Sequence, residues 1–112
     1  MITHYETVVG KLVLPFAMAF EHVFRYWTLD TIKLVTSGHR KNINLWDVTE
    51  ENNPKNYQNE GIFVEMLPNG DYALVCVDLF WNCGLRVNDE VGLYWDPRFS
   101  YLNCKLIHKV HV

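Results

Sequence analysis

The sequence has no long hydrophobic run, and its first residues carry no targeting pattern. No uninterrupted apolar stretch approaches the roughly 18 residues that a membrane-spanning helix needs. The N-terminal segment MITHYETVVG lacks the basic start and the apolar run of a secretory signal. We therefore expect a chain that does not contact a membrane.

Cysteine is scarce and follows no ligand or disulfide pattern. Cys76, Cys83 and Cys104 are odd in number and form no CxxC motif. This usage is typical of reduced, mostly buried thiols in an intracellular protein. His108 and His111 lie close to Cys104, but a fourth ligand at a suitable spacing is missing. We therefore expect no metal site.

Catalytic motifs are missing as well. The chain has no nucleophile elbow, no phosphate-binding loop and no HExxH motif. Asp89 and Glu90 are adjacent, so in a strand or turn their side chains would point apart instead of acting as an acid–base pair. We expect neither an enzyme nor a protein that binds a cofactor.

Positive charge is not in excess. Ten Lys and Arg residues stand against thirteen Asp and Glu residues, which gives a formal net charge of −3. Domains that bind nucleic acid are usually basic, because contacts to phosphate supply most of the affinity. Charge alone therefore argues against a nucleic-acid partner.

Apolar and aromatic residues are abundant. Hydrophobic residues make up 49% and aromatic residues 14% of the 112 positions, which argues against disorder. This length suffices for one domain, residues 1–112, that buries a core without disulfides or a metal. Tyr26 and Trp27 are candidates for exposed partner contacts. Four other aromatic side chains are expected in the core: Trp46, Trp81, Tyr94 and Trp95.

Segments with strand patterns follow one another along most of the chain. Some alternate apolar and polar residues with a period of two, and others are short apolar runs between turn signals. The predicted strands cover residues 31–35, 43–48, 62–67, 72–77, 91–95 and 101–107. Residues 37–41 and 68–71 are predicted as hairpin turns, the second because Asn-Gly favours a two-residue loop. Residues 49–61 are polar and are predicted as a solvated loop.

Two short helices are predicted. One covers Phe16–Phe24. Pro15 before it favours a helix start, because proline has a fixed φ angle and has no N–H group that would be left without a partner. The other follows Asp78, whose carboxylate can accept from the free amides of a first turn, and ends at Gly84. Hairpin-linked strands, without alternating strands and helices, predict a mainly β, α+β fold with an antiparallel sheet that curls or closes.

Two stretches of the sequence resemble the plant-specific B3 DNA-binding domain. The first is GKLVLPFAMAFEHVF, an apolar stretch ending in proline and followed by a short helix with His22 near its end. The second, more specific stretch is YALVCVDLFWNCGLRVNDEVGLYWDP. Its matching residues are Tyr72, Leu74, Leu85, Asp89, Glu90, Val91, Gly92, Tyr94 and Trp95. The resemblance extends from about Thr7 to Ile107.

The resemblance implies an open seven-stranded β-pseudobarrel with an N-terminal strand and two short helices. It also implies sequence-specific binding of double-stranded DNA in the major groove by a nuclear protein that regulates transcription. In the family, two arms grip the groove. Here the first arm is residues 10–17, and the second is the hairpin that contains Glu65 and Asp71.

The residues expected to bind DNA come from these arms and from one basic turn. Arg40 and Lys41, next to His39, form the densest basic spot in the sequence and are expected to contact the DNA backbone. Lys11 is expected to contact phosphate, and Asn69 could present its amide to adenine. The complete set is Lys11, Phe16, Arg40, Lys41, Met66 and Asn69.

The arms depart from the family pattern in their charge. Polar or basic residues commonly follow the proline, whereas this chain has Phe16 and Ala17, which have no donor for a base edge or phosphate. Glu65 and Asp71 place negative charge in the second arm. These departures favour a second hypothesis, a B3-derived module that binds protein or itself and binds DNA weakly or not at all. Asn88, outside the arms, stands where glycine is typical.

Overall fold

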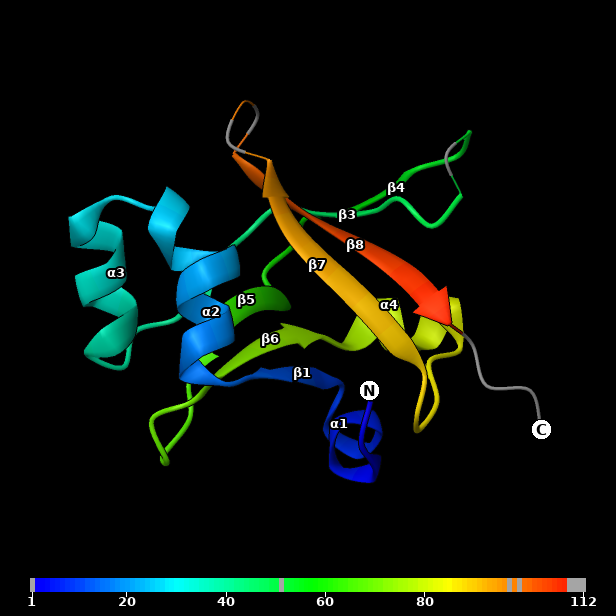
Figure 1. Cartoon of the computed structure of the whole chain (residues 1–112), viewed down its shortest axis with the longest axis horizontal. Coiled ribbons are helices and arrows are strands. Elements are labelled where there is room, and N and C mark those ends of the chain that lie inside the picture. The colour runs from blue at the N-terminus through cyan, green and yellow to red at the C-terminus, as the bar shows by residue number, and fades with distance from the viewer. Residues whose placement is uncertain (1, 51, 97, 99, 109–112) are drawn as a thin grey trace.

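The chain folds into two small sheets with helices packed around them (Figure 1). The structure is a computed structural model that describes residues 2–50, 52–96, 98 and 100–108. Within these residues, eight strands form two four-stranded sheets, accompanied by four α-helices and one 3-10 helix. The sheets do not close into a barrel. The α+β class dominated by strands agrees with the sequence prediction, but two helices were too few.

The first sheet is antiparallel and has the strand order β1-β6-β5-β2. Its strands are β1 (Lys11–Leu14), β6 (Tyr72–Cys76), β5 (Ile62–Met66) and β2 (Lys41–Asn42). Leu12 and Val64 both lie opposite Leu74, so the three side chains share one face. All three are buried, and this face forms one side of the core.

The second sheet has the strand order β4-β3-β8-β7. Its strands are β4 (Lys55–Tyr57), β3 (Leu45–Asp47), β8 (Tyr101–His108) and β7 (Glu90–Asp96). β7 and β8 form a long hairpin that runs diagonally across the molecule in Figure 1. β3 and β8 are parallel, with Leu45 opposite Leu102. Both leucines are fully buried and form the other side of the core.

The helices occupy the connections between strands. Their bounds are α1 (His4–Val9), α2 (Phe16–His22), η1 (Phe24–Tyr26), α3 (Leu29–Thr36) and α4 (Val77–Cys83). A capping box begins α1: Glu6 N–H donates to Thr3 Oγ1 and Thr3 N–H donates to Glu6 Oε1. α1 therefore lies where the resemblance implies an N-terminal strand. No helix of the described residues is long and apolar enough to cross a membrane.

The predicted strand at residues 31–35 is wrong, because this segment is part of helix α3. Thr28 caps the helix, and its Oγ1 accepts from the N–H of Thr31 at 3.2 Å. Ile32 and Val35 are three residues apart, so both face the core, and Val35 is fully buried. Helical packing thus overrides the β-branched composition of a window that is only five residues long.

Other local predictions need smaller corrections. The predicted loop at residues 49–61 contains β4, which pairs with β3. Asp78 does not cap α4: the helix begins at Val77, and the Asp78 carboxylate accepts from Asn59 Nδ2 at 3.2 Å. The loop between β5 and β6 covers residues 67–71 instead of two residues. The left-handed stop at Gly84 is confirmed, with φ at 58°.

Only some of the aromatic residues predicted to lie in the core are shielded from solvent. Trp46 and Trp95 are half-buried, and Trp95 packs against the core. Trp81 and Tyr94 are not core residues, since their exposed fractions are 81% and 50%. The three cysteines are free, as predicted, with Cys76 and Cys104 buried and Cys83 half-buried.

Asn88, found where glycine is typical, has a left-handed backbone with φ at 72°. Its N–H donates to the carbonyl of Ile2 at 2.7 Å, and the N–H of Ile2 donates to the carbonyl of Asp89 at 2.8 Å. Two residues thus oppose one, with the first in the left-handed region, which is the pattern of a G1 bulge. The bulge joins the N-terminal residues to the turn before β7, and asparagine is among the residues that tolerate this conformation.

Candidate nucleic-acid interface

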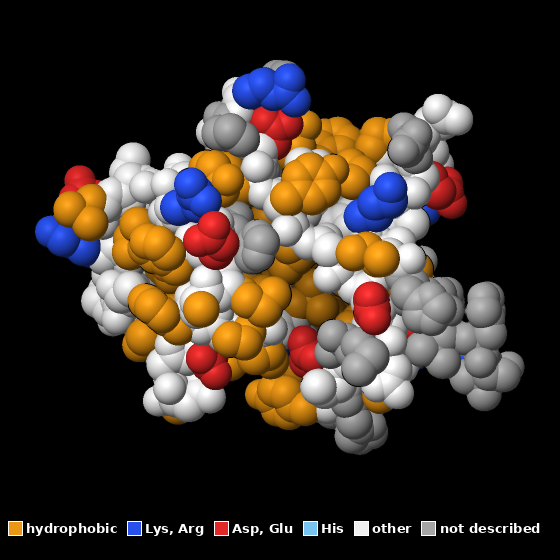
Figure 2. Space-filling view, viewed as in Figure 1, with side chains coloured by type: hydrophobic (Ala, Val, Ile, Leu, Met, Phe, Trp, Pro, Cys, Tyr) orange, Lys and Arg blue, Asp and Glu red, His pale blue; other side chains and the backbone are white. Residues whose placement is uncertain are grey.

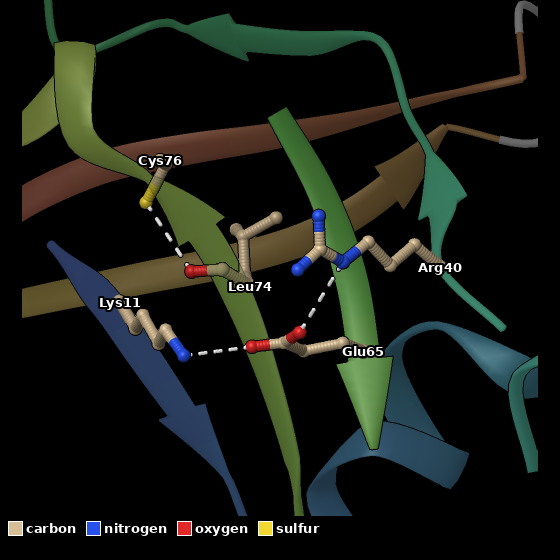
Figure 3. Close-up of polar contacts among 5 residues, drawn as sticks. All are labelled: Lys11, Arg40, Glu65, Leu74 and Cys76. Atoms are coloured by element: carbon tan, nitrogen blue, oxygen red, sulfur yellow. Dashed lines mark hydrogen bonds and ion pairs between the residues drawn. The ribbon is translucent and has the colours of Figure 1, made fainter. Parts of the chain in front are cut away.

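Lys11 and Arg40 converge on a single carboxylate, that of Glu65 (Figure 3). Lys11 Nζ lies 2.7 Å from Glu65 Oε1, and Arg40 Nε lies 3.7 Å from Glu65 Oε2. Lys11 is on β1 and Glu65 on β5, with β6 between them, and Arg40 precedes β2 on the other side of β5. We call these three residues the Glu65 cluster.

The Glu65 cluster reduces the charge available to phosphate. The exposed fractions of the Glu65 and Lys11 side chains are 18% and 26%, so water screens this ion pair only partly. The guanidinium of Arg40 also lies over the ring of Phe63, 4.5 Å from its centroid, in a cation–π contact. Lys11, Arg40 and Lys41 against Glu65 and Asp71 give 3 − 2 = +1 for the arms and basic turn, within a chain of net charge −3.

Lys41 does not join Arg40 in one basic spot. Lys41 pairs with Val64, whereas Arg40 reaches Phe63 and Glu65, which point to the other face of β5. The exposed side chain of Lys41 lines a cavity of about 620 Å³ together with Trp27. The side chains of Arg40 and Lys41 therefore lie on opposite faces of the sheet.

The tips of the two arms meet. Phe16, the first residue of α2, donates its N–H to Asp71 Oδ1 at 3.3 Å. Asp71 in turn donates its N–H to Asn69 Oδ1 at 3.1 Å and accepts from Asn69 Nδ2 at 3.1 Å. The amide of Asn69 is thus engaged within its own turn, which leaves one N–H of Nδ2 and one lone pair of Oδ1 for a base edge.

Phe16 and Met66 belong to an apolar part of the arms rather than to the Glu65 cluster. Phe16 stacks on Phe20 with ring centroids 6.4 Å apart, and the two side chains are 56% and 51% exposed. Phe16 also contacts Tyr72, which lies opposite Met66 in the sheet. We call Phe16, Phe20 and Met66 the apolar arm surface. Of the predicted DNA-binding residues, Lys11 and Arg40 therefore lie in the Glu65 cluster and Phe16 and Met66 in the apolar arm surface. Lys41 and Asn69 belong to neither group.

Sequence reasoning placed Glu65 in the second arm but missed its ion pairs with Lys11 and Arg40. Strand order decides which side chains become neighbours across a sheet, and no local pattern encodes that order. Phe20 was missed too, although its spacing of four residues from Phe16 on a predicted helix is a usable signal. The side chain of His22, which belongs to the family resemblance, lies outside the described part of the structure.

The cysteines do not form a reactive site. Burial and the carboxylate of Asp47 raise the pKa of Cys83 to about 12, and its Sγ donates to Asp47 Oδ2 at 3.1 Å. Burial raises the pKa of Cys76 to about 12. No cluster of potential metal ligands occurs among the described residues. His111 and the side chain of His108, which the sequence places near Cys104, lie outside them.

Comparison with known proteins yields no relative. No protein-family profile matches the chain, and no curated protein or solved structure matches it.

Proposed function

We propose that this chain binds double-stranded DNA in the major groove as a B3-type domain of a nuclear transcription regulator. The open pseudobarrel implied by the B3 resemblance is part of the proposal, which assigns the chain no catalytic activity. One observation carries it: two segments that lie 55 residues apart in the sequence meet at Phe16 and Asp71. These are the segments that the resemblance names as DNA-gripping arms.

The charge of the arms sets the mechanism. Lys11 and Arg40 exchange Glu65 for phosphate when the arms enter the groove. This exchange is easiest for Arg40, whose side chain is 68% exposed, because exposed ion pairs contribute only about 0–1 kcal/mol to stability. A phosphate contact, by contrast, also releases condensed counterions from DNA. Affinity should therefore be modest and strongly dependent on salt.

Mobility shift with a pool of random duplexes tests the proposal. We expect a shift at about 50 mM salt that weakens steeply as salt is raised, with a log–log slope of roughly 0.9 for each phosphate neutralised. Two or three phosphate contacts, from Lys11, Arg40 and Lys41, correspond to a slope of about 2–3. No shift at the lower salt would contradict DNA binding.

Substitution of Lys11 tests whether the first arm contacts DNA. Lys11→Ala should lower the salt slope by about one and weaken binding by roughly tenfold at low salt, because one phosphate contact is lost. Lys105→Ala is the matched control, since Lys105 is an exposed lysine on β8 of the other sheet. Equal losses in the two variants would indicate general attraction between charges and remove Lys11 from the interface.

The apolar arm surface favours a second candidate function, binding to protein or to another copy of this chain. Stacked and half-exposed phenylalanines at a DNA-binding arm offer no donor to phosphate, whereas aromatic side chains are enriched at the centres of protein interfaces. Light scattering separates the two functions. A dimer that Phe20→Ser converts to a monomer, together with no DNA shift at low salt, would favour the interaction module.

A further inference from the structure

A cavity of about 530 Å³ lies between β1 and β7. In Figure 2, hydrophobic side chains gather over the middle of the molecule, in the region between these strands. We call this space the seam cavity. Its apolar lining includes the side chains of Leu12, Leu14, Met18, Val23, Val91 and Leu93. Glu6 and Thr3 are the polar residues of the lining.

The size and lining of the seam cavity suit a small-molecule ligand. A mostly apolar hollow of this volume falls within the roughly 300–1,000 Å³ of small-molecule pockets. The cavity occurs because β1 pairs only with β6 and β7 only with β8 among the described strands, so the edges of the two sheets face each other.

The edge of β1 argues against an added peptide strand as the occupant. The N–H of Val13 points away from β6 and donates to Glu6 Oε2 at 2.7 Å. A side chain that occupies an edge amide in this way prevents further strand pairing. A small molecule needs no backbone pairing and fits this site better.

Glu6 gives the seam cavity one polar end. Its exposed fraction is 6%, and its two oxygens accept from the N–H groups of Thr3 and Val13. Each carboxylate oxygen has a further lone pair, so the group can accept another strong donor. We infer that the seam cavity binds a linear alkyl chain that carries a protonated primary amine, with the amine at Glu6 and the chain along the apolar wall. This inference does not depend on DNA binding.

Calorimetric titration without DNA tests this site. The probes are decylamine, decanol and decanoate, which share one chain length, and propylamine, which carries the head group alone. We expect decylamine to bind, decanol to bind about tenfold more weakly because it lacks the charge, and decanoate and propylamine to show no binding. Decylamine should also shift the amide resonances of Val13, Gly92 and Leu93, which line the cavity.

Three variants locate the amine and the chain. Glu6→Gln should weaken decylamine by about tenfold and leave decanol unchanged, because only the charged hydrogen bond is lost. Glu90→Gln, at an exposed carboxylate outside the lining, is the matched control and should bind like the parent. Leu93→Phe should weaken binding of both probes severalfold, because its larger ring intrudes on the wall along which the chain lies.

Three results would overturn the inference: equal affinity for decanoate, equal losses in Glu6→Gln and Glu90→Gln, or undiminished binding to a folded Leu93→Phe variant. Glu6 also caps α1, so Glu6→Gln carries a folding risk that circular dichroism reports. Leu93→Phe leaves the cap intact and decides the question in that case. Because no assay contains DNA, failure here leaves the proposed DNA binding untouched.

Discussion

Asn88 holds a backbone conformation that side chains rarely adopt, and the bulge that it forms ties Ile2 to the turn before β7. Asn88→Val should destabilise the fold by roughly 1–3 kcal/mol, because a β-branched residue is strained at this φ. Asn88→Gly should be neutral or slightly stabilising, since glycine has no Cβ to clash. Urea denaturation measures both. Equal stability of the two variants would show that the bulge does not constrain the chain.

Cys83 is half-buried but should react slowly. With its pKa raised to about 12 by burial and by Asp47, the thiolate needed for alkylation is rare at pH 8. Iodoacetamide should therefore modify native Cys83 roughly a thousandfold more slowly than a free cysteine. Asp47→Asn removes the negative charge beside the thiol and should speed the reaction. Peptide mapping after timed quenching gives the rates, and a native rate like that of free cysteine would contradict this description.

At the scale of single elements, one side chain of β5 would oppose the DNA binding that we propose. Glu65 on β5 faces the two cations that phosphate would need. Glu65→Gln should strengthen DNA binding by roughly fivefold to tenfold at low salt, because it frees Lys11 and Arg40 and removes one repulsive charge. Fluorescence anisotropy with a labelled duplex measures the change. Glu50→Gln, an equal charge change at an exposed residue outside the arms, is the control, and an identical gain there would exclude a role for the cluster.

The elements that local pattern determines were predictable, and those that distant contacts determine were not. β5, β6, β7 and β8 follow their predicted segments, because apolar runs between turn residues have few alternatives. β4 has a polar sequence and becomes a strand through pairing with β3. No local sequence pattern predicts this pairing. The segments that the B3 resemblance names as arms could be located in the sequence, and their role in DNA binding stays a prediction. The partners of Lys11 and Asn69 could not be predicted, since they depend on strand order and on the true length of the 67–71 loop.

At the scale of the whole molecule, one core joins the two sheets, and its loss should unfold both. Leu102 on β8 is fully buried opposite Leu45, while Ile107 on the same strand is 64% exposed. Leu102→Ala should cost about 2–5 kcal/mol of unfolding free energy, and Ile107→Ala about 0.5 kcal/mol or less. Urea titrations followed by tryptophan fluorescence and by circular dichroism should give coincident transitions. Separate transitions would mean that the sheets unfold independently.

The parallel pairing of β3 with β8 delays the completion of the second sheet during synthesis. Residues 45–47 pair with residues 55–57 on one side, but their neighbours on the other side are residues 102–104, whereas every strand of the first sheet has been synthesised by residue 76. During translation, the first sheet can assemble before β8 has been synthesised. Leu45, which is fully buried in the folded protein, is then still exposed on the side that β8 later covers. Until β8 has been synthesised, this side of β3 stays uncovered, and this is the period in which the chain needs protection from aggregation.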